Sequence, residues 1–298
     1  MAPPIEFYNT YTKNIETEAI YGERFLRWGY ERMLGRMAVG LLIKRALFSR
    51  WYGWRMSQPS SRARIAPFIE KYGIDCGEMS QEPKSYESFN AFFARRLQPS
   101  ARPICPKDQA IVFPADGRHM VIPKISALKH FYVKGVTFDL AALLRDQELG
   151  EKFADGAMLI SRLCPVDYHR FHFPCAGVPE VAHGILGPLY SVSPLALRRR
   201  PTILWENKRT VTSLRTESLG EVLLLEVGAT CVGTIQQTFQ PRKAVSKGEE
   251  KGYFLFGGSC CITLFEPGGV RFSDVLLEHS AQQREVYAHM GDEAGIFC

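Results

Sequence analysis

The chain has 298 residues and a net charge of +6. Its 46% hydrophobic and 23% charged residues are typical of a globular protein with a sizeable core. No apolar run is long enough to span a membrane, and the first residues, MAPPIEFYN, lack the features of a secretory signal peptide. The eight cysteines include no CxxC pair, so we expect reduced thiols in a cytosolic setting rather than a zinc ribbon or a thioredoxin-like site.

Residues 16–55 predict a helical segment, because apolar residues recur at three- and four-residue spacing with few breakers. Between Arg24 and Arg64 the only acidic residue is Glu31, and tryptophans are interleaved with the many basic residues. This composition favours binding to an anionic membrane surface. A nucleic-acid groove uses similar charges, but no nucleic-acid motif accompanies them, and we expect no nucleic acid as a partner. The alternative without a ligand is a solvated helix face whose aromatic side packs on the core.

Two further helices are predicted before the middle of the chain. One covers residues 65–72, and the other covers residues 86–97 and follows the capping-type Ser85. Prolines at 99, 103 and 106 then mark a connector.

From about residue 110, short apolar runs alternate with glycine, proline and aspartate turns, which indicates closely spaced strands. Residues 140–147 predict one short helix among them. The sequence therefore predicts an α+β fold. A helical, membrane-associating N-terminal region, residues 1–109, packs on a β-rich, barrel- or sandwich-like catalytic core, residues 110–298.

The stretch DYHRFHFP places His169 and His172 three residues apart, beside Asp167 and Arg170. In a strand the two rings point to opposite faces, whereas in a turn both approach one site. A single histidine is usually a structural residue, but two of them beside these charged groups make acid–base chemistry a second interpretation, and both stay open. We expect no metal, because no third ligand follows at a recognisable spacing. The stretch PADGR puts Asp116 in an Asp-Gly turn, which is common in structural turns as well.

The stretch FLFGGSCCITLF, residues 254–265, contains a candidate nucleophile, Ser259. One interpretation is a hairpin in which Gly257-Gly258 is the turn between two strands. The other is catalytic: Ser259 as nucleophile, His172 as base and Asp116 as the group that orients the base. Sequence spacing alone leaves both open.

Five blocks, taken in order, resemble the phosphatidylserine decarboxylase family. They are FFARRL at 92–97, PADGR at 114–118, DYHRFHFP at 167–174, VGATCVGTI at 227–235 and KGEEKGYFLFGGS at 247–259. The N-terminal stretch from Tyr21 to Gly53 also resembles that of a subset of bacterial members.

The resemblance implies a self-processing enzyme that converts phosphatidylserine to phosphatidylethanolamine and carbon dioxide in phospholipid biosynthesis. The Gly258–Ser259 bond would be cut by the protein itself, giving a β chain, 1–258, and an α chain, 259–298. Ser259 would become a covalent pyruvoyl group that forms a Schiff base with the substrate. The family's self-cleavage triad falls on Asp116, His172 and Ser259, and His169 matches the histidine associated with decarboxylation.

The resemblance further implies a peripheral protein on the cytoplasmic face of the cell membrane, and a homodimer. A pyruvoyl-dependent decarboxylase of a small soluble amino acid and an uncleaved, inactive membrane-binding protein are the alternatives. One position departs from the family pattern: Cys260 stands where a threonine usually follows the modified serine. A thiol is a weaker hydrogen-bond donor than a hydroxyl, so two outcomes stay open: slower processing, or a thiol that serves equally well. This departure carries little weight, because the three triad residues are all present.

Overall fold

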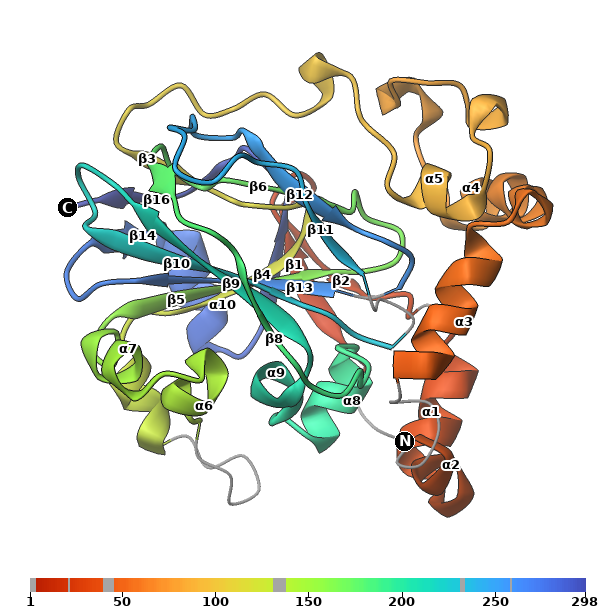
Figure 1. Ribbon diagram of the computed structural model, residues 1–298, viewed down its shortest axis with the longest axis horizontal. Coiled ribbons are helices and arrows are strands. Elements are labelled where there is room, and N and C mark those ends of the chain that lie inside the picture. Colours follow the sequence, from red (N-terminus) through yellow and green to blue (C-terminus); the bar gives the residue numbers. More distant parts are fainter. Residues whose placement is uncertain (1–3, 21, 40–45, 131–137, 231–233, 258) are drawn as a thin grey trace.

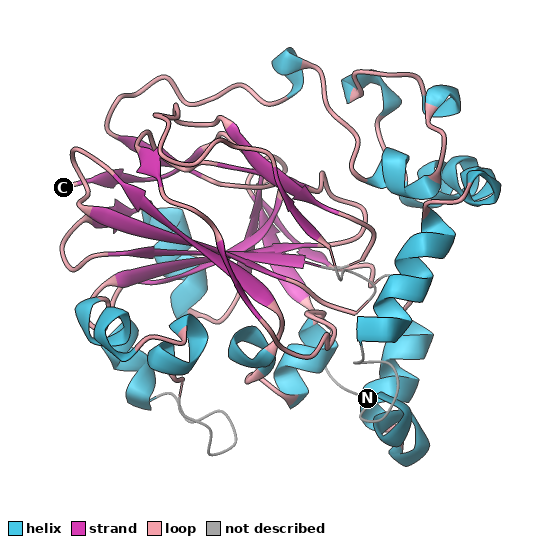
Figure 2. Cartoon of the chain, viewed as in Figure 1, coloured by secondary structure: helices cyan, strands magenta, loops and turns pink. Residues whose placement is uncertain are grey.

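The computed structural model describes residues 4–20, 22–39, 46–130, 138–230, 234–257 and 259–298. Figures 1 and 2 show a β-rich core with a group of helices standing along one side. The predicted α+β fold is confirmed. In the described part of the chain, the largest sheet has two free ends, β2 and β7, and does not close into a barrel.

Ten of the described strands form this central sheet, in the order β2-β1-β15-β4-β5-β13-β10-β9-β7, with β8 also paired to β9. All neighbours are antiparallel except β1 and β15. The strands are β1 (Glu6–Asn9), β2 (Asn14–Thr17), β4 (Gly117–Ile122), β5 (Ala157–Leu163), β7 (Val178–Pro179), β8 (His183–Ile185), β9 (Arg209–Arg215), β10 (Glu221–Val227), β13 (Ser259–Phe265) and β15 (Glu285–Ala288).

Both faces of the central sheet are covered, and β13, between β5 and β10, is buried along its whole length. Alternate side chains of a strand point to opposite faces. Cys260, Ile262 and Leu264 accordingly lie in one apolar cluster, and Cys261 and Phe265 lie in clusters on the other side. A strand buried on both faces reads as a continuous apolar run, which explains the sequence SCCITLF.

Short helices cover the first face and two three-stranded sheets cover the second. The helices are α6 (Leu140–Leu144), α7 (Gln147–Lys152), α8 (Pro194–Arg199) and α9 (Ile203–Glu206), and α10 (Asp274–Ala281) packs on β4 and β15. One small sheet contains β6 (Arg170–His172), β11 (Ile235–Gln237) and β12 (Glu250–Phe254), and the other contains β3 (Ala110–Val112), β14 (Val270–Phe272) and β16 (Glu293–Phe297).

The N-terminal region supplies the helices at the side of the core: α1 (Glu23–Glu31), α2 (Met33–Ala38), α3 (Ala46–Met56), α4 (Ile65–Tyr72) and α5 (Phe89–Phe93). Short 3₁₀ helices lie at Pro59–Arg64, Cys76–Glu78, Pro83–Ser85, Pro99–Ala101 and Ile125–His130. No helix among the residues described here is both long and apolar enough to cross a bilayer.

The predicted helix at 65–72 is confirmed at both ends. The helix predicted at 86–97 is shorter, because Ser88 rather than Ser85 caps it by accepting a hydrogen bond from the Ala91 backbone N–H. The helix predicted at 140–147 ends at Leu144, since Arg145 adopts the left-handed conformation that terminates helices.

The helical segment predicted at 16–55 begins later than expected, because Asn14–Thr17 is strand β2 and the first helix starts at Glu23. β1 and β2 form a hairpin, and β1 pairs in parallel with β15, near the other end of the chain. Phe7 is buried and packs edge-on against Tyr287. The first residues of the N-terminal region thus belong to the central sheet, and the boundary at residues 109 and 110 stays a prediction.

Candidate active site

The segment that joins β12 to β13 crosses between two sheets. β12 pairs with β6 and β11, whereas β13 pairs with β5 and β10, so the two strands are not partners. The hairpin interpretation of FLFGGSCCITLF is therefore wrong. Gly257 has a φ of 139°, a conformation open to glycine but strained for other residues. Gly258 lies outside the described residues.

Aromatic packing fixes the last residues before the two glycines. The Phe256 ring is buried against Phe89 and Phe93, with both ring centroids 5.0 Å away. The Phe256 backbone N–H donates a hydrogen bond of 2.9 Å to the Asn90 side-chain oxygen. Helix α5 therefore holds the chain at the point where it enters the crossover.

Ser259 is the first residue of β13 and is fully buried. Within the described part of the chain its Oγ atom has no hydrogen-bond partner. A buried hydroxyl without a partner is costly. Such an atom at the start of a central strand is a candidate reacting group.

His169 contacts this crossover directly. Its Nε2 atom lies 3.1 Å from the Gly257 carbonyl oxygen, and its Nδ1 atom lies 3.0 Å from the Asp167 carbonyl oxygen. The Phe93 ring packs against the imidazole, with the centroids 4.0 Å apart. Burial lowers the pKa of His169 to about 3, so the ring is neutral at physiological pH. A neutral imidazole has one N–H and can donate to only one of the two carbonyls.

His172 is held by a different carbonyl. Its Nδ1 atom donates a hydrogen bond of 2.9 Å to the Gly248 oxygen, which leaves the proton off Nε2. Nε2 is buried and has no hydrogen-bond partner among the described residues. Burial lowers the pKa of His172, and the Asp116 charge opposes that effect. The ring thus carries an available lone pair, as a general base must.

Asp116 is paired with Arg102. The Arg102 guanidinium binds the carboxylate at 2.7 to 3.0 Å and also binds Glu78, and the Met290 backbone N–H donates to Asp116 at 2.8 Å. No hydrogen bond joins Asp116 to His172 within the residues described. Within the described residues, His172 and Ser259 of the predicted triad thus each have a buried atom without a hydrogen-bond partner. Asp116, the third member, forms an ion pair with the Arg102 guanidinium.

The sequence placed Asp167 beside the two histidines but did not show how it or Gly248 fixes them. Asp167 holds the turn before His169, since its carboxylate accepts bonds from Arg118 and from the Cys164 backbone N–H, both at 2.7 Å. Gly248 presents its carbonyl to His172 from a left-handed conformation, with φ 79°. The sequence offered one signal for Gly248, its place in the block KGEEKGYFLFGGS. A backbone carbonyl that accepts a hydrogen bond leaves no pattern in the side chains.

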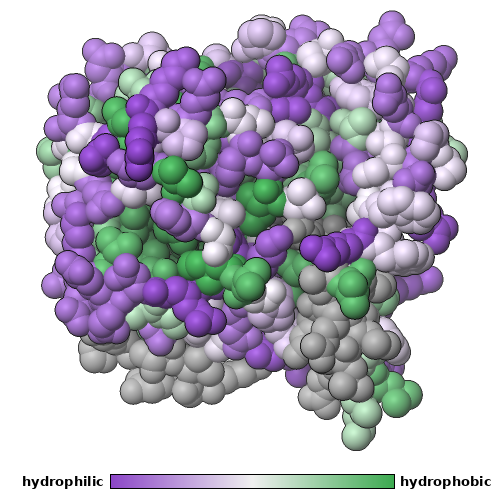
Figure 3. Space-filling model, viewed as in Figure 1, coloured by the Kyte–Doolittle hydropathy of each residue, from purple (hydrophilic) through white to green (hydrophobic). Residues whose placement is uncertain are grey.

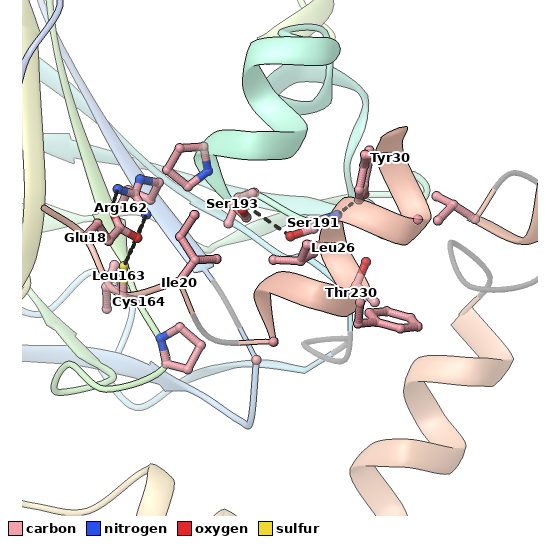
Figure 4. A pocket seen from close by; sticks show the side chains of 18 of the residues that line it. Glu18, Ile20, Leu26, Tyr30, Arg162, Leu163, Cys164, Ser191, Ser193 and Thr230 are labelled. Atoms are coloured by element: carbon pink, nitrogen blue, oxygen red, sulfur yellow. Dashed lines mark hydrogen bonds and ion pairs between the residues drawn. The ribbon is translucent and has the colours of Figure 1, made fainter. Parts of the chain in front are cut away.

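A mainly apolar cavity of about 140 Å³ adjoins the crossover, and Phe256 and Gly257 line it. Figure 4 shows other lining residues, among them Leu26 and Tyr30 of α1 and Arg162 of β5. Helix α1 forms another wall through Phe25, Leu26 and Tyr30. The loop at 191–194 and the end of β5 complete it.

The polar end of this cavity is an ion pair. Arg162 lies 2.5 Å from Glu18 and 2.5 Å from Glu285, and the Cys164 thiol lies 3.0 Å from Glu18. Burial alone would raise the pKa of Glu18, but Arg162 and Arg118 lower it to about 2. The charges at this end are therefore already paired within the protein.

Comparison with known proteins gives a consistent result. The family model described as phosphatidylserine decarboxylase matches residues 89–295. The chain is 40% identical over 291 residues to a phosphatidylserine decarboxylase proenzyme of Clostridium botulinum, covering 98% of each chain. It is 40% identical over 292 residues to the proenzyme of Clostridium kluyveri, covering 98% of this chain and 99% of the relative. It is also 42% identical over 290 residues to that of Chlamydia pneumoniae, covering 97% and 96%.

Proposed function

The chain belongs to the phosphatidylserine decarboxylase family, and we propose that it matures by cutting its own Gly258–Ser259 bond. Its reaction is the conversion of phosphatidylserine to phosphatidylethanolamine and carbon dioxide. The observation that supports the cleavage position best is the buried Ser259 hydroxyl without a partner among described residues, at the end of a glycine crossover between two sheets. The name proenzyme, carried by the relatives, is consistent with such processing.

The proposed cleavage uses only groups of the chain itself. Ser259 Oγ attacks the Gly258 carbonyl carbon while His172 Nε2 accepts the hydroxyl proton, and the peptide bond becomes an ester with a free amine on residue 259. Loss of the Cα proton then expels the Gly258 carboxylate, which leaves a dehydroalanine at 259. Water converts its enamine to a ketone and releases ammonia. The lone pair on His172 Nε2 supports its role as the base, and we propose that Asp116 assists through its charge.

The product of this sequence at residue 259 is a pyruvoyl group. The residues present fit it, because the start of β13 is buried, adjoins an apolar cavity and is held between β5 and β10. The group supplies an electrophilic carbonyl that withdraws electrons from the bond to the leaving carboxylate. Strand pairing of residues 259–265 would keep the new chain end in position after the cut.

His169 is the proposed proton carrier for turnover. It lies against Gly257, its neutral form is favoured by burial, and the Asp167 carbonyl orients its ring. The apolar wall formed by Phe93 and Phe256 excludes water from the imidazole. In this proposal Nε2 accepts a proton from the ammonium group of the substrate and returns it to the carbon that has lost the carboxylate.

We also infer that α1–α3 bring the enzyme to its lipid. Large apolar side chains are exposed on these helices, among them Phe25, Trp28, Met33, Leu34, Met37, Leu47, Trp51 and Trp54. Figure 3 has apolar side chains, in green, at the projecting end of the α1–α2 arm. Basic residues of the same helices would bind anionic headgroups. Because α1 also walls the cavity beside Gly257, lipid would reach the site along an apolar path. Peripheral binding to the cytoplasmic face and a homodimer are the corresponding predictions.

Intact mass measurement of the purified protein tests the cleavage proposal. We expect two fragments, 1–258 and 259–298, with the second blocked to N-terminal sequencing by its ketone. Ser259→Ala should give one mass of 33.7 kDa. Ser218→Ala, which removes a hydroxyl in an exposed loop, should be cut like the wild type. A wild-type chain that stays intact and inactive would refute the proposal.

A further inference from the structure

A second cavity, of about 290 Å³, lies between α3, α4 and α5. We call it the aromatic groove, and the rings that line it are Tyr52, Phe68, Tyr72, Phe89 and Phe256. An opening lined by rings on a protein surface is suited to an extended apolar ligand rather than to a polar metabolite.

The rim of the groove is cationic. Arg64 and Lys71 line it and both are exposed, and none of the described lining residues is acidic. The Lys71 ammonium lies 5.2 Å from the Tyr72 ring centroid, so the charge sits at the edge of the aromatic wall. A ligand that matches this arrangement has an apolar chain and an anionic group at one end.

Helix α3 joins the groove to the exposed apolar surface already described. Tyr52 and Met56 of α3 line the groove, while Trp51 and Trp54 of the same helix are half or more exposed. A helix that lies on a bilayer through Trp51 and Trp54 would bring the groove to the level of the lipid headgroups. In this respect the inference rests on the membrane binding proposed above.

We propose that the aromatic groove binds one acyl chain of an anionic phospholipid of the bilayer, with the lipid phosphate against Arg64 and Lys71. This lipid is distinct from the substrate. Phe256 lines both the groove and the cavity beside Gly257, so its side chain lies between the two. The polar end of the cavity beside Gly257 has its charges paired internally, whereas the rim of the groove offers two cations.

The test uses phosphatidylcholine vesicles that contain phosphatidylglycerol with a photoreactive diazirine in one acyl chain. After illumination, mass spectrometry locates the labelled peptides. We expect label within residues 52–72 of the wild type. Ala63→Trp fills the groove from an exposed position, and should reduce this label several-fold without changing label on α1. Ala66→Trp, on an exposed position of α4 that does not line the groove, is the matched control.

The charge requirement is tested separately. Arg64→Gln and Lys71→Gln should each lower the label about five-fold, the factor that corresponds to ~1 kcal/mol per basic residue near an anionic surface. Lys243→Gln and Arg271→Gln, which remove exposed charges elsewhere, should not.

Two results would overturn the proposal. One is equal labelling of residues 52–72 in the Ala63→Trp and Ala66→Trp proteins. The other is label that unlabelled phosphatidylserine displaces and unlabelled phosphatidylglycerol does not, since the groove would then belong to the substrate site. Cleavage at Ser259 is scored on the same samples by mass. A failure of self-processing is thereby seen independently of the labelling.

Discussion

The Nε2 atom of His169 lies 3.1 Å from the carbonyl oxygen of Gly257, one residue upstream of the proposed cleavage bond Gly258–Ser259. Its other ring nitrogen faces a second carbonyl, that of Asp167. Both partners are acceptors, while burial favours the ring form with a single N–H. One of the two contacts is thus always without a proton. If Gly257 moves after cleavage, its carbonyl no longer competes with that of Asp167 for the single N–H of the ring. Nε2 is then available to the substrate.

The first prediction separates the two histidines. His172→Ala should remain a single chain, because Ser259 loses its base. His169→Ala should still be cut, but should release carbon dioxide about 10² to 10⁴ times more slowly, the range that general acid–base catalysis contributes. Mass spectrometry measures the cut, and trapped carbon dioxide measures turnover.

A third histidine is the control for this pair. His183→Ala changes an exposed residue of β8 and should alter neither quantity. If His169→Ala stays uncut while His172→Ala is processed, the proposed roles are exchanged.

The second prediction concerns the Arg102–Asp116 ion pair. Both side chains are buried, so Arg102→Gln leaves a carboxylate without its cation and should lower the free energy of unfolding by about 3 to 5 kcal/mol. Lys107→Gln breaks a solvent-exposed pair with Glu293 and should leave the free energy of unfolding close to that of the wild type. Urea unfolding measures both.

The rates of self-cleavage in two variants then distinguish a structural role of Asp116 from a role in the cleavage reaction. Asp116→Asn should slow self-cleavage more than Arg102→Gln does, because only the first removes the charge that acts on His172. Equal rates in the two variants would argue that Asp116 has a structural role alone.

Local pattern was sufficient for some elements and not for others. Helix α4 was predicted to the residue, because an amphipathic run ends at Gly73, which takes the left-handed conformation. The strand at Glu6–Asn9 was missed, since its partner β15 is more than 270 positions away and short local sequence carries no trace of that pairing.

The site shows the same division. Residue type and the order of the five sequence blocks made His169, His172 and Ser259 candidates, and their roles stay predictions. The sequence could not show that the apolar runs on either side of Gly257 and Gly258 belong to different sheets, because strand pairing depends on residues far apart in the chain. The Arg102–Asp116 pair was hidden for the same reason.

The third prediction is the pH dependence of stability. Burial lowers the pKa of His119 and His169 to about 3, whereas both titrate near 6.5 in the unfolded chain. The unfolded chain therefore takes up protons first as the pH falls. Stability contributed by the neutral rings is complete above about pH 6.5 and is lost between there and pH 3. Glu18, with its pKa lowered to about 2, adds a further loss below its ordinary value of 4.5.

Urea unfolding at a series of pH values checks this. Between pH 6.5 and 4.5, His119→Gln should reduce the slope of unfolding free energy by up to about 1.4 kcal/mol per pH unit. An unchanged slope would mean that His119 is protonated in the native protein.

The fourth prediction tests the membrane surface. Trp54→Ala and Leu47→Ala remove side chains that are 62% and 76% exposed, and each should weaken co-sedimentation with phosphatidylglycerol vesicles about ten-fold. Added salt should weaken wild-type binding as well, because basic residues contribute. Leu186→Ala, equally exposed on another part of the surface, should bind like the wild type. Equal losses in all three variants would contradict a specific role for α3.

The fifth prediction addresses Cys260. Its side chain packs in the apolar cluster on the face of β13 opposite to Ser259, and its Sγ atom lies 3.5 Å from the Cys261 carbonyl oxygen. A threonine hydroxyl could donate to that same oxygen, so Cys260→Thr should change the free energy of unfolding by less than about 1 kcal/mol.

Cleavage of the same variant, followed by gel electrophoresis after synthesis, should change less than about ten-fold, or ~1.4 kcal/mol in the barrier. A hydroxyl at position 260 faces away from the Ser259 side chain and reaches the scissile bond only if β13 twists at its first residue. Much faster cleavage of Cys260→Thr would require that twist. It would also mean that the thiol at position 260 slows self-cleavage in the wild type. A small effect would explain how a cysteine can occupy this position, since the reacting side chain and its neighbour point to opposite faces of the strand.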